Sequence, residues 1–236
     1  MFETIDSTND EALRRIEAGA GGGEVILAAR QTAGRGRHGR DWDSPPGNLY
    51  LSVTVDPPTG RPAGELAFVA GLAAAEAIEA ATGGAARVQL KWPNDLMLGG
   101  RKLGGLLIEG ATGAARPTLA LGLGVNLVRF PEDASYPATS LAEAGCPVAP
   151  EIVARAFCER LEDWLRTWET DGFAPVRTGW LARAAGLGGR LVAHLPDGKS
   201  CDGLFLDIDE RGALVLQTEN GMTHRVTAGA IFPATD

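Results

Sequence analysis

The sequence predicts an α+β protein in two parts: a larger part that mixes helices and strands, and a small all-β part at the C-terminus. Apolar residues recur at helical spacing over residues 65–81 and 149–168, and short apolar or β-branched runs lie before and between these segments. After residues 186–189, short alternating runs are separated by turn signals such as Asn220-Gly221. With 236 residues, 44% of them hydrophobic, the chain can bury a sizeable core. We therefore expect a boundary between residues 186 and 187.

The first element expected is a helix that begins at Ser7-Thr8-Asn9, where Thr8 and Glu11 have capping-box spacing, and that ends before the glycines of residues 19–23. Gly99-Gly100 is typical of a hairpin between two short strands. The remaining helices are expected over residues 65–81, 149–168 and 172–185. Strands are expected over 24–29, 49–55, 88–91, 95–98, 102–109 and 118–126, and in the small part over 190–195, 203–208, 213–216 and 223–226.

Charge and targeting signals exclude several classes of protein. The net charge is -8, which argues against a general nucleic-acid or anionic-membrane binder. The N-terminus lacks the pattern of a signal peptide, and no apolar run approaches the roughly 18 residues of a membrane span. Cys146, Cys158 and Cys201 have neither disulfide nor metal-ligand spacing. They are expected to be buried, reduced thiols of a cytoplasmic protein, and no metal site is expected.

The segment Gly34–Arg40, with the sequence GRGRHGR, carries the sharpest local pattern. It fits a dinucleotide-binding fingerprint, but that fingerprint requires a following helix, and Pro45-Pro46 forbid one. Guanidinium groups on a glycine-rich loop suit carboxylate and phosphate oxygens. The alternatives are a solvated basic loop or an RNA-binding Arg-Gly tract.

Two further segments leave alternatives open. Lys91 ends an apolar strand, where an ammonium group is costly unless it meets an anion or water. Taken alone, Lys91–Asp95 favours a structural turn with a surface lysine over a ligand site. Gly122 and Gly124 in a strand indicate close approach of a ligand or another backbone, or a barrel-like bend. Asn126 is expected to have a free amide at that strand's end.

The chain offers cations and amides but no evident covalent nucleophile. His38, His194 and His224 have no ligand spacing, and no Ser-His-Asp arrangement or nucleophile elbow is present. This favours a reaction catalysed by positioning and charge stabilisation, as in nucleotidyl transfer.

Taken together, the segments resemble biotin–protein ligases over nearly the whole chain. The resemblance implies a class II synthetase-like mixed sheet flanked by helices, as a catalytic biotin- and ATP-binding domain over 1–186, and an SH3-like β-barrel domain over 187–236. Because the Ser-Thr-Asn segment begins at residue 7, the form without an N-terminal DNA-binding domain is expected. The segments that carry the resemblance are Ser7-Thr8-Asn9, Gln31, Gly34–Trp42, Lys91–Asp95, Lys102–Gly105 and Gly122–Asn126.

The resemblance also implies a biotin–[biotin carboxyl-carrier protein] ligase. Such an enzyme uses ATP and Mg²⁺ to convert biotin into biotinyl-5′-AMP, and transfers biotin to a lysine of a carrier such as that of acetyl-CoA carboxylase. Biotin is a substrate, and no permanently bound cofactor is expected. The implied partner is the carrier domain, without DNA or membrane, and the enzyme is expected to be a cytoplasmic monomer or homodimer.

Roles carry over from the family to matching positions. Lys102 would lie between the biotin carboxylate and the α-phosphate, Trp42 would stack on adenine, and the loop Gly34–Trp42 would be mobile when empty. His38 receives no role. The catalytic residues are expected to be Lys102 and Arg37, with Lys91 and Asp95 in support. Biotin binding is assigned to Ser7, Thr8, Asn9, Gln31, Arg35, Gly36, Arg37, Lys102 and Gly104, and nucleotide binding to Arg37, Arg40, Trp42, Asn94, Lys102 and Asn126.

Three other hypotheses compete with this one. A lipoate- or octanoate-handling acyltransferase of the related fold shares a lysine at the position of Lys102, but the Gly-Arg loop and the Lys91–Asp95 segment favour biotin. A non-catalytic nucleotide- or RNA-binding module could use the same loop, although it would not release pyrophosphate. A transcriptional repressor is disfavoured by the acidic balance and the absence of the N-terminal domain.

Overall fold

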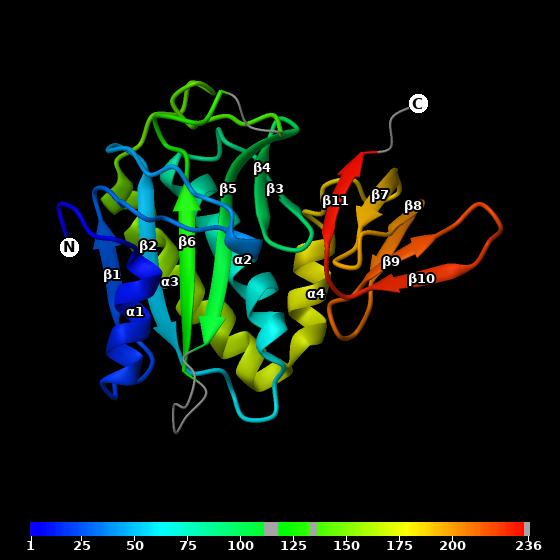
Figure 1. Ribbon diagram of the computed structural model, residues 1–236, viewed down its shortest axis with the longest axis horizontal. Coiled ribbons are helices and arrows are strands. Elements are labelled where there is room, and N and C mark those ends of the chain that lie inside the picture. The colour runs from blue at the N-terminus through cyan, green and yellow to red at the C-terminus, as the bar shows by residue number, and fades with distance from the viewer. Residues whose placement is uncertain (111–117, 133–135, 234–236) are drawn as a thin grey trace.

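The computed structural model describes residues 1–110, 118–132 and 136–233, and these form two sheets (Figure 1). In the larger sheet the strand order is β1-β2-β6-β5-β4-β3, and all neighbours pair antiparallel. Isolated parallel bridges, such as that between Leu90 and Ala184, make the sheet a mixed one. The strands are β1 (Val25–Ala28), β2 (Leu49–Val55), β3 (Val88–Lys91), β4 (Asp95–Leu98), β5 (Arg101–Gly110) and β6 (Leu119–Val125).

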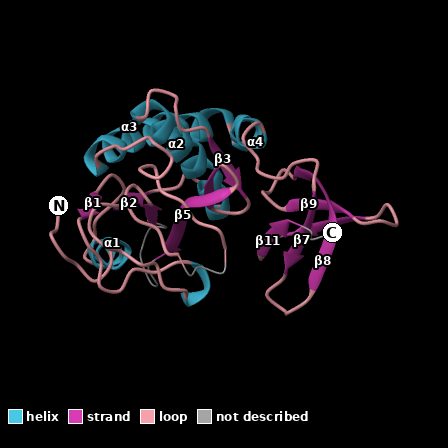
Figure 2. Cartoon of the chain, turned by 90° about the horizontal axis from the view of Figure 1, so that it is seen from above, coloured by secondary structure: helices cyan, strands magenta, loops and turns pink. Residues whose placement is uncertain are grey.

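Helices cover both faces of this sheet, as expected (Figure 2). On one face lie α2 (Leu66–Ala81), α3 (Pro150–Asp171) and α4 (Phe173–Leu181), and on the other lies α1 (Thr8–Glu17). Because β2 lies between α1 and α3, all seven of its residues are buried. The strand therefore exposes neither of its faces to solvent.

The first helix begins one residue earlier than its capping pattern predicted. The N-cap is Ser7, whose hydroxyl accepts a hydrogen bond from the Asp10 backbone N–H, and Thr8 already belongs to the first turn. Assigning the cap to Thr8 was therefore wrong. Thr8 and Asn9, in the first turn of the helix, are 4% and 3% exposed and lie buried against the sheet.

The small sheet has the strand order β10-β9-β8-β7-β11, and its last strand was not expected from the sequence. Within the described residues, β10 and β11 form its two edges and do not pair, so the sheet is not hydrogen-bonded into a closed barrel. The structure therefore has the small antiparallel domain that was expected, as an open sheet. Its strands are β7 (Arg190–His194), β8 (Ser200–Ile208), β9 (Leu214–Gln217), β10 (Thr223–Val226) and β11 (Ala230–Pro233).

Specific contacts attach the small sheet to the larger part. The buried Trp92 indole donates a hydrogen bond to the Gly212 carbonyl oxygen at 3.0 Å, which satisfies its polar edge. Arg177 of α4 pairs with Asp207 of β8. These contacts place β11 beside the end of β3 (Figure 1).

The three cysteines are free thiols, but they are half-buried, so the expectation of full burial was wrong.

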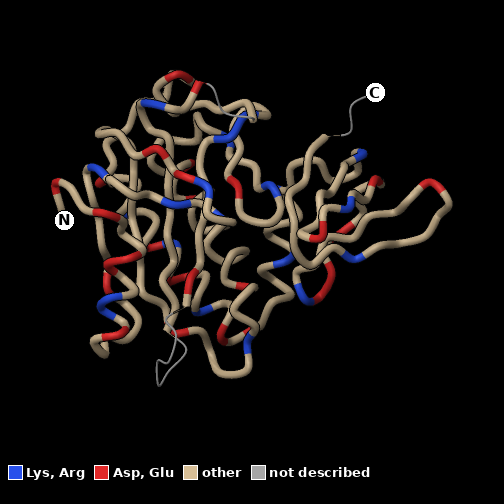
Figure 3. Tube along the Cα trace, viewed as in Figure 1, with Lys and Arg blue, Asp and Glu red and all other residues tan. Residues whose placement is uncertain are grey.

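Acidic and basic residues are interspersed over both sheets (Figure 3). In the part of the chain that the structure describes, no helix combines the length and apolar character needed to cross a membrane.

Candidate active site

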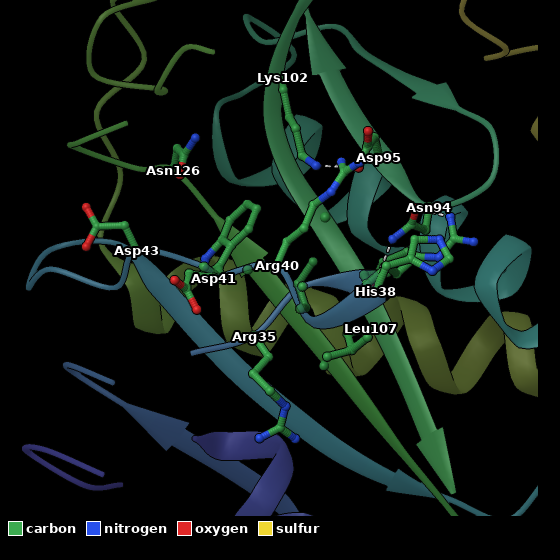
Figure 4. Close-up of a pocket in the computed structure, with 18 of the residues that line it drawn as sticks. Arg35, His38, Arg40, Asp41, Asp43, Asn94, Asp95, Lys102, Leu107 and Asn126 are labelled. Atoms are coloured by element: carbon green, nitrogen blue, oxygen red, sulfur yellow. Dashed lines mark hydrogen bonds and ion pairs between the residues drawn. The ribbon is translucent and has the colours of Figure 1, made fainter. Parts of the chain in front are cut away.

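A cavity of about 280 Å³ lies over the sheet between the Gly-Arg loop, α1 and β11 (Figure 4). Its size is near the lower end for small-molecule pockets. Gly104 is the exception among the site residues expected from the sequence. It packs against β6, where a Cβ would lie 2.5 Å from the Gly124 carbonyl oxygen, and Gly105 lines the cavity instead. The expected residues that do line the cavity are Ser7, Thr8, Asn9, Gln31, Arg35, Gly36, Arg37, Arg40, Trp42, Lys91, Asn94, Asp95, Lys102 and Asn126.

One end of the cavity presents neutral hydrogen-bonding groups. The Thr8 backbone N–H and hydroxyl donate to Gln31 Oε1 at 2.8 and 3.1 Å, and Gln31 Nε2 donates to the Ser44 hydroxyl at 3.0 Å. This network uses one of the two amide protons of Gln31. The hydroxyl of Ser7 accepts a capping hydrogen bond and keeps its own proton. Ser7 and Gln31 can therefore each donate to a ligand.

Asn9 is held in one orientation by three contacts. Its amide nitrogen donates to the Leu107 carbonyl oxygen at 3.3 Å and to Glu109 Oε2 at 2.8 Å, while Ser52 donates to its Oδ1 at 2.7 Å. With both amide protons used, Asn9 presents only its oxygen to a ligand. Sequence reasoning missed Ser52 and Glu109. A serine inside the otherwise apolar segment 49–53 was the available signal for Ser52.

Two glycines of β6 make room for side chains on the cavity face of the sheet. Gly122 and Gly124 are two residues apart and so share one face. A Cβ on Gly122 would lie 2.5 Å from Asn9 Oδ1, and a Cβ on Gly124 would lie 2.8 Å from the Trp42 ring. The close approach expected at these glycines is therefore made by side chains, and not by another backbone.

The other end of the cavity is cationic. Lys102 Nζ lies 2.6 Å from Asp95 Oδ1 and 5.5 Å from the centre of the Trp42 ring (Figure 4). Lys91 Nζ lies 3.9 Å from the other oxygen of the same carboxylate. Two ammonium groups thus share one carboxylate, which leaves net positive charge. Lys91 is only 8% exposed, so the expectation of a surface lysine was wrong.

Arg37 adds a further cation to this end. Its guanidinium donates to Asn94 Oδ1 at 3.2 Å and to the Gly229 carbonyl oxygen at 3.4 Å. Both acceptors are neutral, and burial lowers the pKa of Arg37. Asp95 acts on Arg37 without forming an ion pair with it and is already engaged by two lysines, so a bound anion would supply a closer counter-charge for Arg37.

Arg35 differs from the other cations because the protein itself supplies its counter-charge. Its guanidinium forms a bidentate pair with Asp10, at 2.6 Å for both bonds, and lies 3.3 Å from both oxygens of Glu109. Figure 4 shows Arg35 turned away from Lys102. Arg35 therefore fastens the loop to α1 and β5.

The backbone of the Gly-Arg loop and the side chain of Asn126 are both fixed by local contacts. The loop contains a short 3₁₀ turn, Arg37–Gly39, in which His38 has a φ of 59°, and no dinucleotide-type helix follows it. The amide of Asn126 donates to the Thr139 carbonyl oxygen at 3.1 Å. The expectation of a free amide was therefore wrong for one of its two N–H groups, and Asn126 keeps the other N–H and its oxygen for a ligand.

Comparisons with known proteins agree with this architecture. Residues 1–126 match the model of the Biotin/lipoate A/B protein ligase family, and residues 192–232 match the Biotin protein ligase C terminal domain. The chain belongs to the Biotin/lipoate A/B protein ligase family.

Within that family, the chain is similar to curated biotin ligases. It is 40% identical to the biotin–[acetyl-CoA-carboxylase] ligase of Paracoccus denitrificans, covering 94% of this chain and 95% of that protein. It is 36% identical to the bifunctional ligase/repressor BirA of Escherichia coli K12, of which it spans 69%, while 93% of this chain is covered. The structure of the Aquifex aeolicus biotin protein ligase in complex with biotin and ATP superposes with a TM-score of 0.87. That alignment has 27% identity and covers 99% of this chain and 98% of that one.

Proposed function

We propose that this protein is a biotin–[biotin carboxyl-carrier protein] ligase. It joins biotin and ATP into biotinyl-5′-AMP and pyrophosphate, and then transfers the biotinyl group to a lysine of a carrier such as that of acetyl-CoA carboxylase. The observation that carries this proposal is a single cavity whose neutral, amide-lined end adjoins a cationic end. Biotin has a matching polarity, with a polar ureido ring at one end and a carboxylate at the other.

The ureido ring binds at the neutral end. Its carbonyl oxygen accepts from the Ser7 hydroxyl and the remaining Gln31 amide proton, and a ring N–H donates to Asn9 Oδ1. Each polar group buried without a partner would cost about 1–3 kcal/mol, so the spare donors and acceptor select for such a ring. The apolar chain of biotin runs past Leu107, which lines the cavity on the same face of the sheet as its pairing partner Gly122.

Adenylation takes place at the cationic end. A biotin carboxylate oxygen attacks the α-phosphorus of ATP, and pyrophosphate leaves with the electrons of the broken P–O bond. The two reactants are both anions, and Lys102 lies where it can offset their repulsion. Electrostatic stabilisation at comparable sites lowers barriers by several kcal/mol. Trp42, seated on Gly124, presents its ring to the adenine.

Magnesium fits this site as a companion of the nucleotide. Asp95 is already engaged by two lysines, and no cluster of three metal-ligating side chains occurs within residues 1–110, 118–132 and 136–233. Mg²⁺ carried by the phosphates of ATP would neutralise part of their charge.

Transfer completes the reaction. The amine of the carrier lysine attacks the acyl carbon of the mixed anhydride, and AMP leaves with the bonding electrons. The loop Gly34–Trp42, fastened through Arg35, excludes water from that anhydride. The segment between Arg35 and Trp42 is mobile in the empty enzyme and becomes ordered over the adenylate.

The chain is organised as two domains. Residues 1–186 form the catalytic domain and residues 187–236 the SH3-like domain. The free thiols suit a reducing compartment, so we place the enzyme in the cytoplasm, as a monomer or homodimer without DNA or membrane partners.

Transfer to a carrier protein tests the proposed function. The protein is incubated with ATP, Mg²⁺ and a biotin carrier domain of acetyl-CoA carboxylase, with biotin in one arm and lipoate in another. Mass spectrometry should find a single biotinylated lysine on the carrier, and exchange of labelled pyrophosphate into ATP should depend on biotin. Labelling with lipoate but not with biotin would overturn the assignment.

A further inference from the structure

Lys91 occupies an unusual position at the cavity wall. It ends β3, is 8% exposed, and its ammonium lies between two aromatic rings. The distance from Nζ to the ring centre is 3.9 Å for Tyr136 and 5.0 Å for Phe232. The two rings also contact each other, with centres 6.1 Å apart. Phe232 belongs to β11 and Lys91 ends β3, so the contact between them joins the small sheet to the catalytic sheet.

The charged groups around Lys91 leave it without a hydrogen-bonded counter-charge. Asp95 lies at 3.9 Å, beyond hydrogen-bond distance, and is held more closely by Lys102 at 2.6 Å. Arg40 is a further positive group close enough to act on Lys91. Across the described residues, the Lys91 ammonium donates no hydrogen bond. Burial accordingly lowers its pKa to about 8.

An aromatic pair has a specific consequence for such a cation. Ring faces attract an ammonium group through their quadrupole but accept no strong hydrogen bond from it. A carboxylate in place of the two rings would accept hydrogen bonds from the Lys91 ammonium and so occupy its N–H groups. Tyr136 and Phe232 therefore hold Lys91 at the cavity while its protons stay available to a ligand with several anionic oxygens.

We propose that Lys91, held between Tyr136 and Phe232, binds the β,γ-phosphate end of the nucleotide during adenylation and the pyrophosphate that leaves. The proposal rests on the proposed function, because it takes the α-phosphate to lie beside Lys102. Lys91 and Lys102 flank the same Asp95 carboxylate, so Lys91 is the neighbouring cation beyond the α-phosphate. It donates hydrogen bonds to the leaving group and is chemically unchanged by the reaction.

The small sheet then builds part of this phosphate site. Gly229, Ala230 and Ile231 line the cavity, and the Gly229 carbonyl oxygen accepts from Arg37. Phe232 follows directly and contacts Lys91. The residues from Gly229 to Phe232 thus position two cations of the site, although they carry no charge themselves.

Lys91→Met tests the proposal, with Lys199→Met as the matched control, because Lys199 is an exposed lysine in a turn of the small sheet. Binding of inorganic pyrophosphate is measured by calorimetry, and pyrophosphate exchange is measured while ATP and biotin are varied separately. Loss of a charge-assisted contact should weaken pyrophosphate binding and raise the KM for ATP roughly ten- to hundredfold. The KM for biotin should not change, and Lys199→Met should behave as the wild type.

Two further variants separate binding from a structural role. Lys91→Arg keeps the charge and should recover part of the pyrophosphate affinity. Phe232→Leu keeps Lys91 but removes one ring, and should raise the KM for ATP more than the KM for biotin. Equal weakening of both substrates would show that these residues only support the fold.

The outcomes distinguish this inference from the proposed function. A wild-type protein that forms no biotinyl-AMP would contradict the proposed function. A wild type that forms it, together with a Lys91→Met variant that binds pyrophosphate and ATP normally, would overturn only the role of Lys91. If Lys91→Met does not fold, Lys91→Arg provides the test. The arginine keeps the positive charge, so this variant should bind pyrophosphate more tightly than a Lys102→Ala protein does. Affinity equal to or weaker than that of Lys102→Ala would overturn the role of the Lys91 charge.

Discussion

Replacing Lys91 by methionine should stabilise the ligand-free protein at neutral pH, and the gain should shrink in alkali. Lys91 is a buried ammonium whose pKa is lowered by burial from its ordinary value of 10.5 to about 8. Methionine has a similar length, fills the space between Tyr136 and Phe232, and makes favourable sulfur–aromatic contacts. The substitution thus removes the cost of a buried charge without leaving a large cavity.

The sign of the pH dependence follows from the protons bound in each state. Between pH 8 and pH 10.5 the unfolded chain keeps the Lys91 proton while the folded protein has lost it. The contribution of Lys91 to the stability of the wild type therefore rises with pH across this window. From pH 7 to pH 10 the Lys91 contribution should grow by about 2.5 kcal/mol, at 1.36 kcal/mol per pKa unit. The methionine variant lacks this contribution, so its advantage should fall by the same amount.

Urea unfolding of both proteins at pH 7, 8, 9 and 10 measures this difference. Titrations of groups that do not interact with Lys91 are common to the two proteins and cancel in the comparison. Lys199→Met is the control, and its difference from the wild type should not vary with pH, because the Lys199 side chain is 79% exposed. A Lys91→Met difference that stays constant from pH 7 to pH 10 would refute the account of a buried, weakly paired ammonium.

Three further predictions concern the ligand site. Lys102→Ala should reduce pyrophosphate exchange by orders of magnitude with an unchanged circular dichroism spectrum, whereas normal exchange would show that Lys102 lies outside the chemistry. Gly122→Ala should displace Asn9 and weaken biotin binding, while Gly124→Ala should displace Trp42 and weaken ATP binding. Overpacking costs about 1–3 kcal/mol, or roughly five- to 150-fold in Kd, and calorimetry that found both ligands weakened equally would contradict this division. Asp10→Asn should speed proteolytic cleavage of the Gly-Arg loop by releasing Arg35, and biotinyl-AMP should slow cleavage in the wild type; equal rates in all three samples would mean that the loop is not a lid.

Local pattern in the sequence predicted most of the larger part of the fold. The strands β2, β3, β4 and β10 have the bounds expected from their apolar runs, and the Gly99-Gly100 hairpin joins β4 to β5 as expected. A strong apolar run between turn residues predicts a strand even when the neighbouring strand with which it pairs is not known. The N-cap was misplaced because Ser7 and Thr8 are both good caps, and packing against the sheet decides between them.

The strand β11 could not be predicted in the same way. Ala230–Pro233 is short, follows a glycine and ends in proline, so its sequence has no strand periodicity. It forms because its partner β7 lies beside it in space, some forty positions earlier in the chain. The cavity wall at Gly229 to Phe232 follows from this long-range pairing, which is why no motif pointed to it.

Long-range contacts, which the sequence does not show, also decide which arginine of the loop can bind the ligand. Arg35 and Arg37 are two residues apart on one glycine-rich loop, and nothing local distinguishes them. Arg35 meets Asp10 and Glu109, which are 25 and 74 positions away, whereas Arg37 meets only the neutral oxygens of Asn94 and Gly229. Ion pairs with distant carboxylates thus give Arg35 a structural role, whereas Arg37 remains able to bind an anionic ligand. The sequence predicted that this loop binds an anion, and only the folded arrangement indicates which of its arginines is available to do so.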